Sequence, residues 1–182
     1  MFSKVLAFGL GALALVRAAP AFSFQTPMLS CDINLPTTVG TAQSFDALEP
    51  GTYSIYNEAF GQNQLRSYRT GDAIYVSRTL EFPGPFGMWR VETSGNPAAN
   101  EYTITNVGLN AGTSATFAGE IATQPGKGNS FAIEPAGEGL YVIKVPNEDK
   151  VWTVDTQTAR SSVYLKGQDG VATAWKFVPF QV

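Results

Sequence analysis

The chain has 182 residues, a formal net charge of −3, a single cysteine and no histidine. The lack of histidine excludes Ser-His-Asp and Cys-His catalysis and any metal site built on histidine. The charge is weakly acidic without a basic cluster, which disfavours nucleic acid and anionic membrane surfaces as partners.

Residues 1–21 have the pattern of a secretory signal peptide. A short start with one positive charge, Lys4, precedes an uncharged apolar run over residues 5–16. Ala19 and Ala21 then form an A-x-A cleavage pattern, which is typical of export signals. The run is shorter than the roughly 20 apolar residues that a spanning helix needs. The sequence therefore predicts a secreted, extracellular protein cleaved after Ala21.

Cleavage there would leave 182 − 21 = 161 residues, enough for one domain with a real core. Loss of Lys4 and Arg17 would change the net charge to 10 − 15 = −5. Cys31 has no second cysteine to pair with inside the chain, so we expect a free or modified thiol and a monomer. A link between two chains through Cys31 is the alternative. Residues 22–45 carry one charge and no sustained period, which predicts a loose or disordered N-terminal extension.

From residue 46 onward, short alternating apolar runs are broken by Gly, Pro, Asn and Asp, which is typical of an all-β domain. GTYSIYN at 51–57, EYTITN at 101–106 and GLYVIKV at 139–145 each contain a Tyr-x-Ile triplet. Residues i and i+2 of a strand share a face, so each pair should be buried on one side. A second landmark, an aromatic residue followed at i+2 by an apolar one, recurs later in each copy, at 89–91, 131–133 and 175–177. Between the two landmarks lies a third element, at 74–76, 163–165 and, in degraded form, 120–122. The sequence thus contains three copies of one unit.

This threefold pattern resembles the β-trefoil proteins, in which three four-stranded units build a barrel capped by hairpins. The resemblance covers residues 46–182 and implies essentially no helix in the mature domain. The expected core consists of the two landmark positions of each copy: Tyr53, Ile55, Trp89, Val91, Tyr102, Ile104, Phe131, Ile133, Tyr141, Ile143, Trp175 and Phe177.

Within the trefoils, the stretches GTYSIYN, MWRVE, SFAIEP and GLYVIKVPNEDKVWTVD resemble the fungal secreted β-trefoil serine protease inhibitors. That resemblance implies a non-catalytic protein that binds an extracellular protease through an exposed loop. A trypsin-like enzyme would require Lys or Arg at a loop tip. Lys127, between two glycines on a tip expected to be flexible, and the Arg160–Ser161 bond are the candidates.

The sequence is more distantly similar to the ricin-B-like lectins, and a carbohydrate-binding protein is therefore the alternative function. Gly87, Asn129 and Thr173 stand where the lectin repeats carry the glutamine of a Gln-x-Trp motif, which departs from the usual galactose site.

Under the lectin alternative, Trp152 would stack on a sugar face. Asn147, Asp149 and Asp155 would supply the polar contacts beside it. A core position for Trp152 is the competing interpretation. Residues 146–150 have the composition of a hairpin turn and lack the regular oxygen ligands of a calcium loop. We therefore expect no metal, no cofactor and no catalysis.

Overall fold

The computed structural model describes residues 47–182 apart from 62, 79–81, 96–99, 157, 169–171 and 181–182. The chain divides into two units, residues 1–41 and 42–182, and the first lies outside the described residues. The predicted signal peptide, the predicted extension over 22–45 and Cys31 all lie outside the described residues too. In the described part of the chain, no helix is long and apolar enough to cross a membrane.

Apart from two single-turn 3₁₀ helices, at Glu58–Phe60 and Gly84–Gly87, the regular structure of the described residues is all β. The twelve strands are β1 (Gly51–Asn57), β2 (Gln64–Arg66), β3 (Tyr75–Ser77), β4 (Trp89–Thr93), β5 (Glu101–Asn106), β6 (Ala111–Ala115), β7 (Ile121–Pro125), β8 (Ser130–Gly137), β9 (Leu140–Lys144), β10 (Val151–Val154), β11 (Ser161–Lys166) and β12 (Ala174–Pro179).

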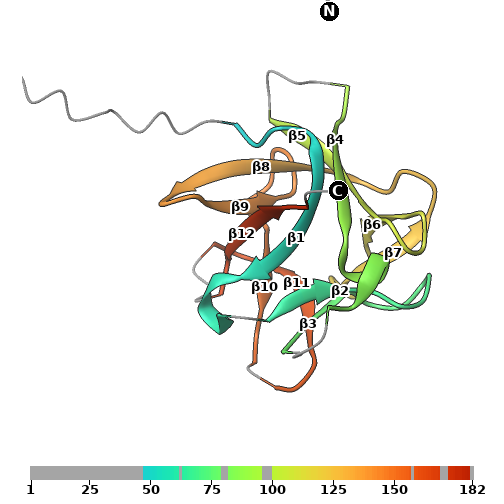
Figure 1. Cartoon of the computed structure of the whole chain (residues 1–182). Helices are drawn as coiled ribbons and strands as arrows, with labels where there is room; N and C mark the ends of the chain where they lie inside the picture. Colours follow the sequence, from blue (N-terminus) through green and yellow to red (C-terminus); the bar gives the residue numbers. More distant parts are fainter. Residues whose placement is uncertain are drawn as a thin grey trace, which may run out of the picture. The chain divides into compact units, whose positions relative to one another are not determined.

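Six of these strands close into a barrel. Strand β1 pairs with β4 and β12, β5 pairs with β4 and β8, and β9 pairs with β8 and β12, all antiparallel (Figure 1). Every barrel strand therefore has two neighbours, and the ring has no free edge. A closed ring avoids the unpaired N–H and C=O groups that an open sheet presents at its sides.

The other six strands form three hairpins, β2–β3, β6–β7 and β10–β11, which cap one end of the barrel. The second strands of these hairpins, β3, β7 and β11, meet one another together with the residues beside them. Ser161 of β11 pairs with Val76 of β3, Ile74 donates its N–H to the carbonyl of Ile121, and Leu165 donates its N–H to the carbonyl of Gly119. The three units of four strands make a β-trefoil, which confirms the predicted fold class.

The register shows why the two landmarks recur. The tyrosine of each first strand pairs with the aromatic residue of the fourth strand in its own unit: Tyr53 with Trp89, Tyr102 with Phe131 and Tyr141 with Trp175. The isoleucine two residues later pairs with the apolar landmark residue of the preceding unit: Ile55 with Phe177, Ile104 with Val91 and Ile143 with Ile133. Each unit therefore completes its pairing only against its neighbour.

The predicted core residues lie in one hydrophobic cluster. All are buried except Tyr141, which is partly buried and packs against the same cluster. The indole N–H of Trp89 donates to the carbonyl of Leu65 in β2 (3.0 Å), and that of Trp175 donates to the carbonyl of Trp152 in β10 (3.1 Å). These bonds fasten barrel strands to the cap hairpins.

Tyrosine hydroxyls hold the segment before β1. Tyr102 donates to the carbonyl of Leu48 (2.7 Å) and Tyr53 to that of Glu49 (2.5 Å). Burial raises the pKa of both tyrosines, so each hydroxyl keeps its proton and remains a donor.

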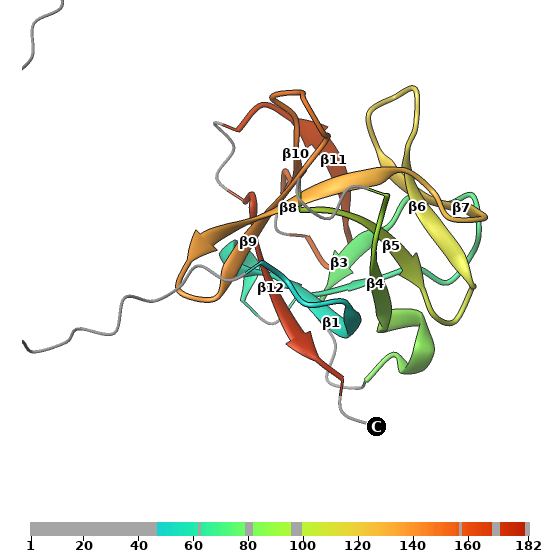
Figure 2. The ribbon, with the colours of Figure 1, turned by 90° about the horizontal axis from the view of Figure 1, so that it is seen from above.

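Strands β8 and β9 extend together to one side of the barrel (Figure 2). Antiparallel pairing brings Ala132 of β8 opposite Lys144 of β9, and Val151 of β10 lies opposite Lys144 on its other side. The turn between β9 and β10 is therefore placed beside the second unit. This junction contains the candidate site.

Candidate functional site

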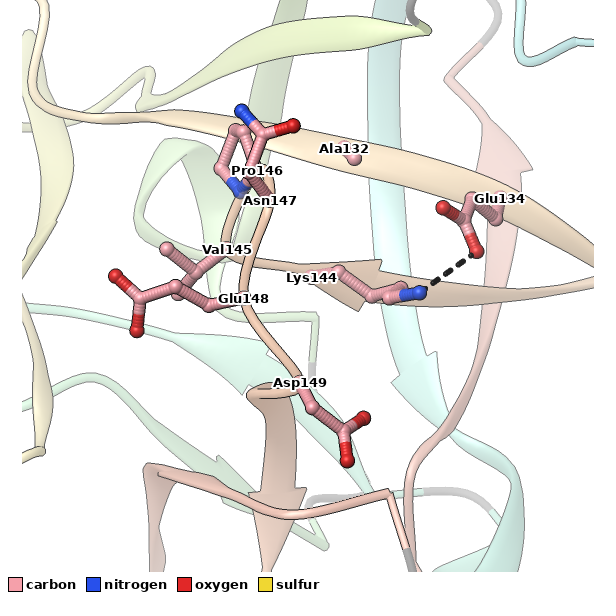
Figure 3. Close-up of a pocket in the computed structure, with 8 residues that line it drawn as sticks. All are labelled: Ala132, Glu134, Lys144, Val145, Pro146, Asn147, Glu148 and Asp149. Atoms are coloured by element: carbon pink, nitrogen blue, oxygen red, sulfur yellow. Dashed lines mark hydrogen bonds and ion pairs between the residues drawn. The ribbon is translucent and has the colours of Figure 1, made fainter. Parts of the chain in front are cut away.

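A surface pocket of about 410 Å³ lies where β8 meets β9 and the β9–β10 turn. Ala132 and Glu134 of β8, Lys144 of β9 and the turn residues 145–149 line it, and we call it the Asn147 pocket (Figure 3). It is shallow and mainly polar, and Ala132, Val145 and Pro146 supply its apolar lining.

The β9–β10 turn is fixed by its own backbone. Val145 donates to the carbonyl of Lys150 (2.9 Å), and Glu148 donates to the carbonyl of Val145 (3.2 Å). Asn147 has a φ of 60°, a left-handed conformation that asparagine adopts more readily than most side chains. The predicted hairpin turn over residues 146–150 is therefore present, and it holds Asn147 and Asp149 at defined positions.

Ion pairs occupy three charged side chains of the pocket wall. The Lys144 ammonium lies 3.2 Å from a Glu134 carboxylate oxygen, and Lys150 lies 2.8 Å from Glu148. Both pairs are at least partly exposed, so each stabilises the fold by at most about 1 kcal/mol. Their main effect is to hold the side chains of the pocket wall in place.

Asn147 and Asp149 have no hydrogen-bond or ion-pair partner among the described residues. Figure 3 shows their side chains leaving the turn in different directions, Asp149 away from the Glu134–Lys144 pair. The Asn147 amide can donate to and accept from a hydroxyl group and the Asp149 carboxylate can accept from one, so the turn offers two separate polar contacts. The described residues contain no group of three or more His, Cys, Asp or Glu side chains placed to hold a metal ion.

The predicted sugar-stacking set is only partly brought together. Asn147 and Asp149 line one pocket, whereas Asp155 pairs with Lys166 (2.6 Å) and lines neither of the two pockets described here. Trp152 was predicted as the stacking residue and this is wrong, because its side chain has no exposed surface. It packs edge-on against Phe131 and Trp175 in the core, which is the competing interpretation of the sequence.

A second surface pocket, of about 390 Å³, contains Lys127. Glu92, Thr103 and Ser130 lie side by side in it because β4, β5 and β8 place them in register across three strands. The hydroxyl oxygen of Ser94, also in the lining, is buried and has no partner. Neither of these two pockets is lined by an aromatic side chain.

The loop that carries Lys127 is held against β6. Gly112 donates to the carbonyl of Gly126 (2.9 Å), and Asn129 donates to the carbonyl of Thr113 (2.8 Å). A Cβ on Gly112 would lie 2.2 Å from the Lys127 carbonyl oxygen. The expectation of a flexible tip is therefore wrong, and the carbonyl that a serine protease would attack is pressed against a strand.

The Arg160–Ser161 bond is not on an exposed, extended loop of the kind that a protease binds. The Arg160 guanidinium carbon sits 3.8 Å above the centre of the Tyr75 ring. Ser161 is buried, pairs with Val76 in the sheet and donates its hydroxyl to the carbonyl of Thr156. A protease must bind several extended residues on both sides of the bond that it attacks. Here the residues that follow the bond, from Ser161 on, are already paired with β3.

Two residues of the pocket wall were not predicted from the sequence. Glu134 and Lys144 are ten positions apart and meet only because β8 and β9 pair in this register. Each stands beside a core residue, Ile133 and Ile143 respectively, so the alternation around the landmarks was the one signal that placed them on the outer face.

No family model matches the chain, and no curated protein matches it in sequence. Solved structures do match in fold. The Rhizoctonia solani agglutinin is 19% identical with a TM-score of 0.57, covering 74% of this chain and 99% of its own. The Macrolepiota procera ricin B-like lectin, solved in complex with lactose, is 17% identical with a TM-score of 0.58, covering 74% and 100%. The Haemophilus ducreyi cytolethal distending toxin is 15% identical with a TM-score of 0.60, covering 72% and 85%. These likenesses carry the fold alone: the chain is a β-trefoil of the shape that ricin B-like lectins share.

Proposed function

We propose that this chain is a secreted, non-catalytic carbohydrate-binding protein and that the Asn147 pocket is its binding site. The observation that carries the proposal is the pair of partnerless polar side chains, Asn147 and Asp149, held by a rigid turn in a concave surface. Sugar hydroxyls require this mixture of donors and acceptors. The structural likeness to an agglutinin and to a lactose-bound lectin supports the same class.

Without an aromatic platform, the pocket would bind a sugar by hydrogen bonds and by the small apolar surface of Val145 and Pro146. In an exposed pocket of this kind, the costs of desolvating polar groups and ordering side chains offset most of the favourable contacts, so the net free energy of binding is small. We therefore expect weak binding of a single sugar. Stronger binding would require a longer glycan that also contacts the outer faces of β8 and β9.

A glycan array followed by calorimetric titration of the best neutral hit tests the proposal. Asn147→Ala should weaken binding about three- to tenfold and Asp149→Asn about tenfold or more, since a bond to a charged acceptor is the stronger of the two. Asp155→Asn is the matched control, because it neutralises a neighbouring carboxylate outside the pocket and should leave the affinity unchanged. Equal loss in the control and in the pocket variants would contradict the assignment of the site.

Protease inhibition is the competing function and is checked on the same preparation. The packing of the Lys127 loop and the burial of Ser161 leave neither predicted bond open to a trypsin-like enzyme. We expect trypsin to keep its activity in the presence of excess protein. A stoichiometric loss of activity that Lys127→Ala or Arg160→Ala abolishes would reverse the ranking of the two functions.

Export rests on residues 1–21 and is a separate proposal. Expression of the full chain in a secreting host, followed by N-terminal sequencing of protein from the medium, should give a chain that begins at Phe22. Retention of the full chain inside the cells would contradict it.

A further inference from the structure

Arg66, Tyr75 and Arg160 form a cationic cluster on the cap, outside both pockets, and we call it the Arg66–Tyr75–Arg160 cluster. Strand β3 lies between β2 and β11, so Tyr75 pairs with Arg66 on one side and with Ser162 on the other. Ile74 and Val76 belong to the core cluster whereas Tyr75 does not, which places Tyr75 and its pairing residue Arg66 on the opposite face of the hairpin, where both are still largely buried. Arg160, two residues before Ser162, covers the Tyr75 ring.

Arg66 is a buried cation with incomplete bonding. Only 5% of the residue is exposed, one terminal nitrogen donates to the carbonyl of Ser77 (3.0 Å), and the Nε atom is buried without a partner. Among the described residues no carboxylate lies within ion-pair distance of it. Removing a guanidinium from water without a counter-charge is unfavourable, so a group that supplied that charge would be bound with a gain in free energy.

Arg160 is the solvent-exposed cation of the cluster. Its guanidinium carbon lies 3.8 Å from the centre of the Tyr75 ring, a cation–π contact that holds the side chain over the ring. It too lacks a carboxylate partner in the described part of the chain, whereas Arg69 pairs with Asp72 (3.9 Å) and Arg90 with Glu92 (3.4 Å). Two arginines thus flank one tyrosine without an acidic partner, in a protein whose net charge is acidic.

The Tyr75 hydroxyl lies within the field of both arginines. Burial raises the pKa of Tyr75, while the charges of Arg160 and Arg66 act in the opposite direction. The phenol remains protonated at neutral pH and is a donor. Tyr75 therefore has a buried guanidinium beside it on β2 and an accessible guanidinium over its ring, and its own hydroxyl is a third donor.

We propose that the Arg66–Tyr75–Arg160 cluster binds an oxyanion, either a carboxylate or a sulfate group. Guanidinium groups match the two oxygens of these anions in a bidentate geometry, and charge-assisted bonds of this kind are about twice as strong as neutral ones. Arg160 makes the first contact from solvent, Arg66 supplies the charge that lacks a partner, and Tyr75 donates a further bond. The proposal is independent of carbohydrate binding at the Asn147 pocket.

Titration of the ¹⁵N-labelled protein with sodium sulfate and, separately, with sodium glucuronate tests the site. Ionic strength is held constant with sodium chloride, and glucose serves as the neutral counterpart of glucuronate. Binding should appear as saturable shifts of the Arg66 and Arg160 Nε–H resonances. Resonance shifts are preferred to melting temperature, because sulfate raises the stability of many proteins without binding. Saturation by both anions identifies the shared oxyanion as the ligand, and saturation by sulfate alone would restrict the site to that anion.

Arg160→Gln is the central variant, because the side chain is exposed and its removal should leave the fold intact. We expect its affinity for either anion to fall about tenfold or more, the loss expected for a charge-assisted bond. Arg69→Gln removes an exposed arginine that already has an acidic partner and should keep the wild-type affinity. Tyr75→Phe should weaken binding about three- to tenfold while keeping the ring under Arg160. Arg66→Gln should likewise lower the affinity about tenfold or more, and Tyr75→Phe provides the second test if that variant fails to fold.

Absence of saturable shifts in the wild type, or equal affinities in Arg160→Gln and Arg69→Gln, would overturn the proposal. The two sites separate cleanly in the same experiments. Arg160→Gln should retain the affinity for the neutral glycan, and Asn147→Ala should retain the shifts caused by sulfate.

Discussion

Replacement of Trp152 by alanine is expected to lower the free energy of unfolding by about 3–5 kcal/mol, the usual cost of deleting a buried aromatic side chain. The side chain has no exposed surface and contacts Phe131 and Trp175 edge-on, with ring centres 5.0 and 6.1 Å away. Its removal would leave a cavity where the barrel meets the third cap hairpin. Urea denaturation followed by fluorescence measures the change.

Trp152→Phe provides the matched variant. The indole N–H of Trp152 is buried without a partner, so phenylalanine removes an unsatisfied donor while it keeps most of the ring contacts. We expect less than half of the loss caused by alanine. A Trp152→Ala protein with wild-type stability but impaired glycan binding would show that the tryptophan acts as a stacking residue after all.

Replacement of Gly128 by alanine is the second large effect, a loss of about 2–5 kcal/mol. Gly128 has a φ of 75°, and a Cβ atom there would lie 2.2 Å from the carbonyl oxygen of Thr113. The left-handed conformation costs an alanine about 1–2 kcal/mol, and the clash with a strand adds about 1–3 kcal/mol. Thermal and chemical denaturation of the purified variant give the value.

Gly126 separates the two contributions. It also has a positive φ, 90°, but a Cβ there would meet nothing within 4 Å. Gly126→Ala should therefore show only the conformational cost, about 1–2 kcal/mol. Equal losses in the two variants would mean that the loop moves away from β6 without cost, and the flexible tip expected from its composition would then be correct.

The core and the threefold pattern could be predicted from the sequence because barrel strands bury one face and expose the other. Trp89 and Val91 of β4 are buried on either side of exposed Arg90, and Trp175 and Phe177 of β12 flank exposed Lys176 in the same way. Trp152 could not be placed this way. Strand β10 is buried at all four of its positions, so it carries no alternation from which a face could be assigned.

The site could be predicted only where its residues are neighbours in the chain. Asn147 and Asp149 belong to one turn, whose composition indicated a hairpin. Glu134 and Lys144 meet through strand register, and Arg66 and Arg160 each reach Tyr75 from a distant part of the chain. No periodic pattern in one sequence reports such pairings, which depend on how separate segments dock.

The glycines around Lys127 show that loop mobility cannot be predicted from glycine content. Their number suggested mobility, yet Gly112 and Gly128 are where the loop backbone and β6 come too close for a side chain. Glycine permits both flexibility and close approach. Composition alone does not distinguish the two, and the three-dimensional contacts decide.

Closure of the barrel by β1 and β12 has a consequence for how the protein folds. Ile55 pairs with Phe177, which lies 177 − 55 = 122 positions further along the chain, so the ring closes through one of its most distant contacts. Folds dominated by such distant pairings commonly fold in milliseconds to seconds, since much of the chain must be ordered before the contact forms. During synthesis, β1 and β9 each lack one neighbour until residues 174–179 leave the ribosome. The edge of β1 thus stays unpaired through most of the elongation, and that of β9 only through its last part, so chaperone binding should concentrate at β1.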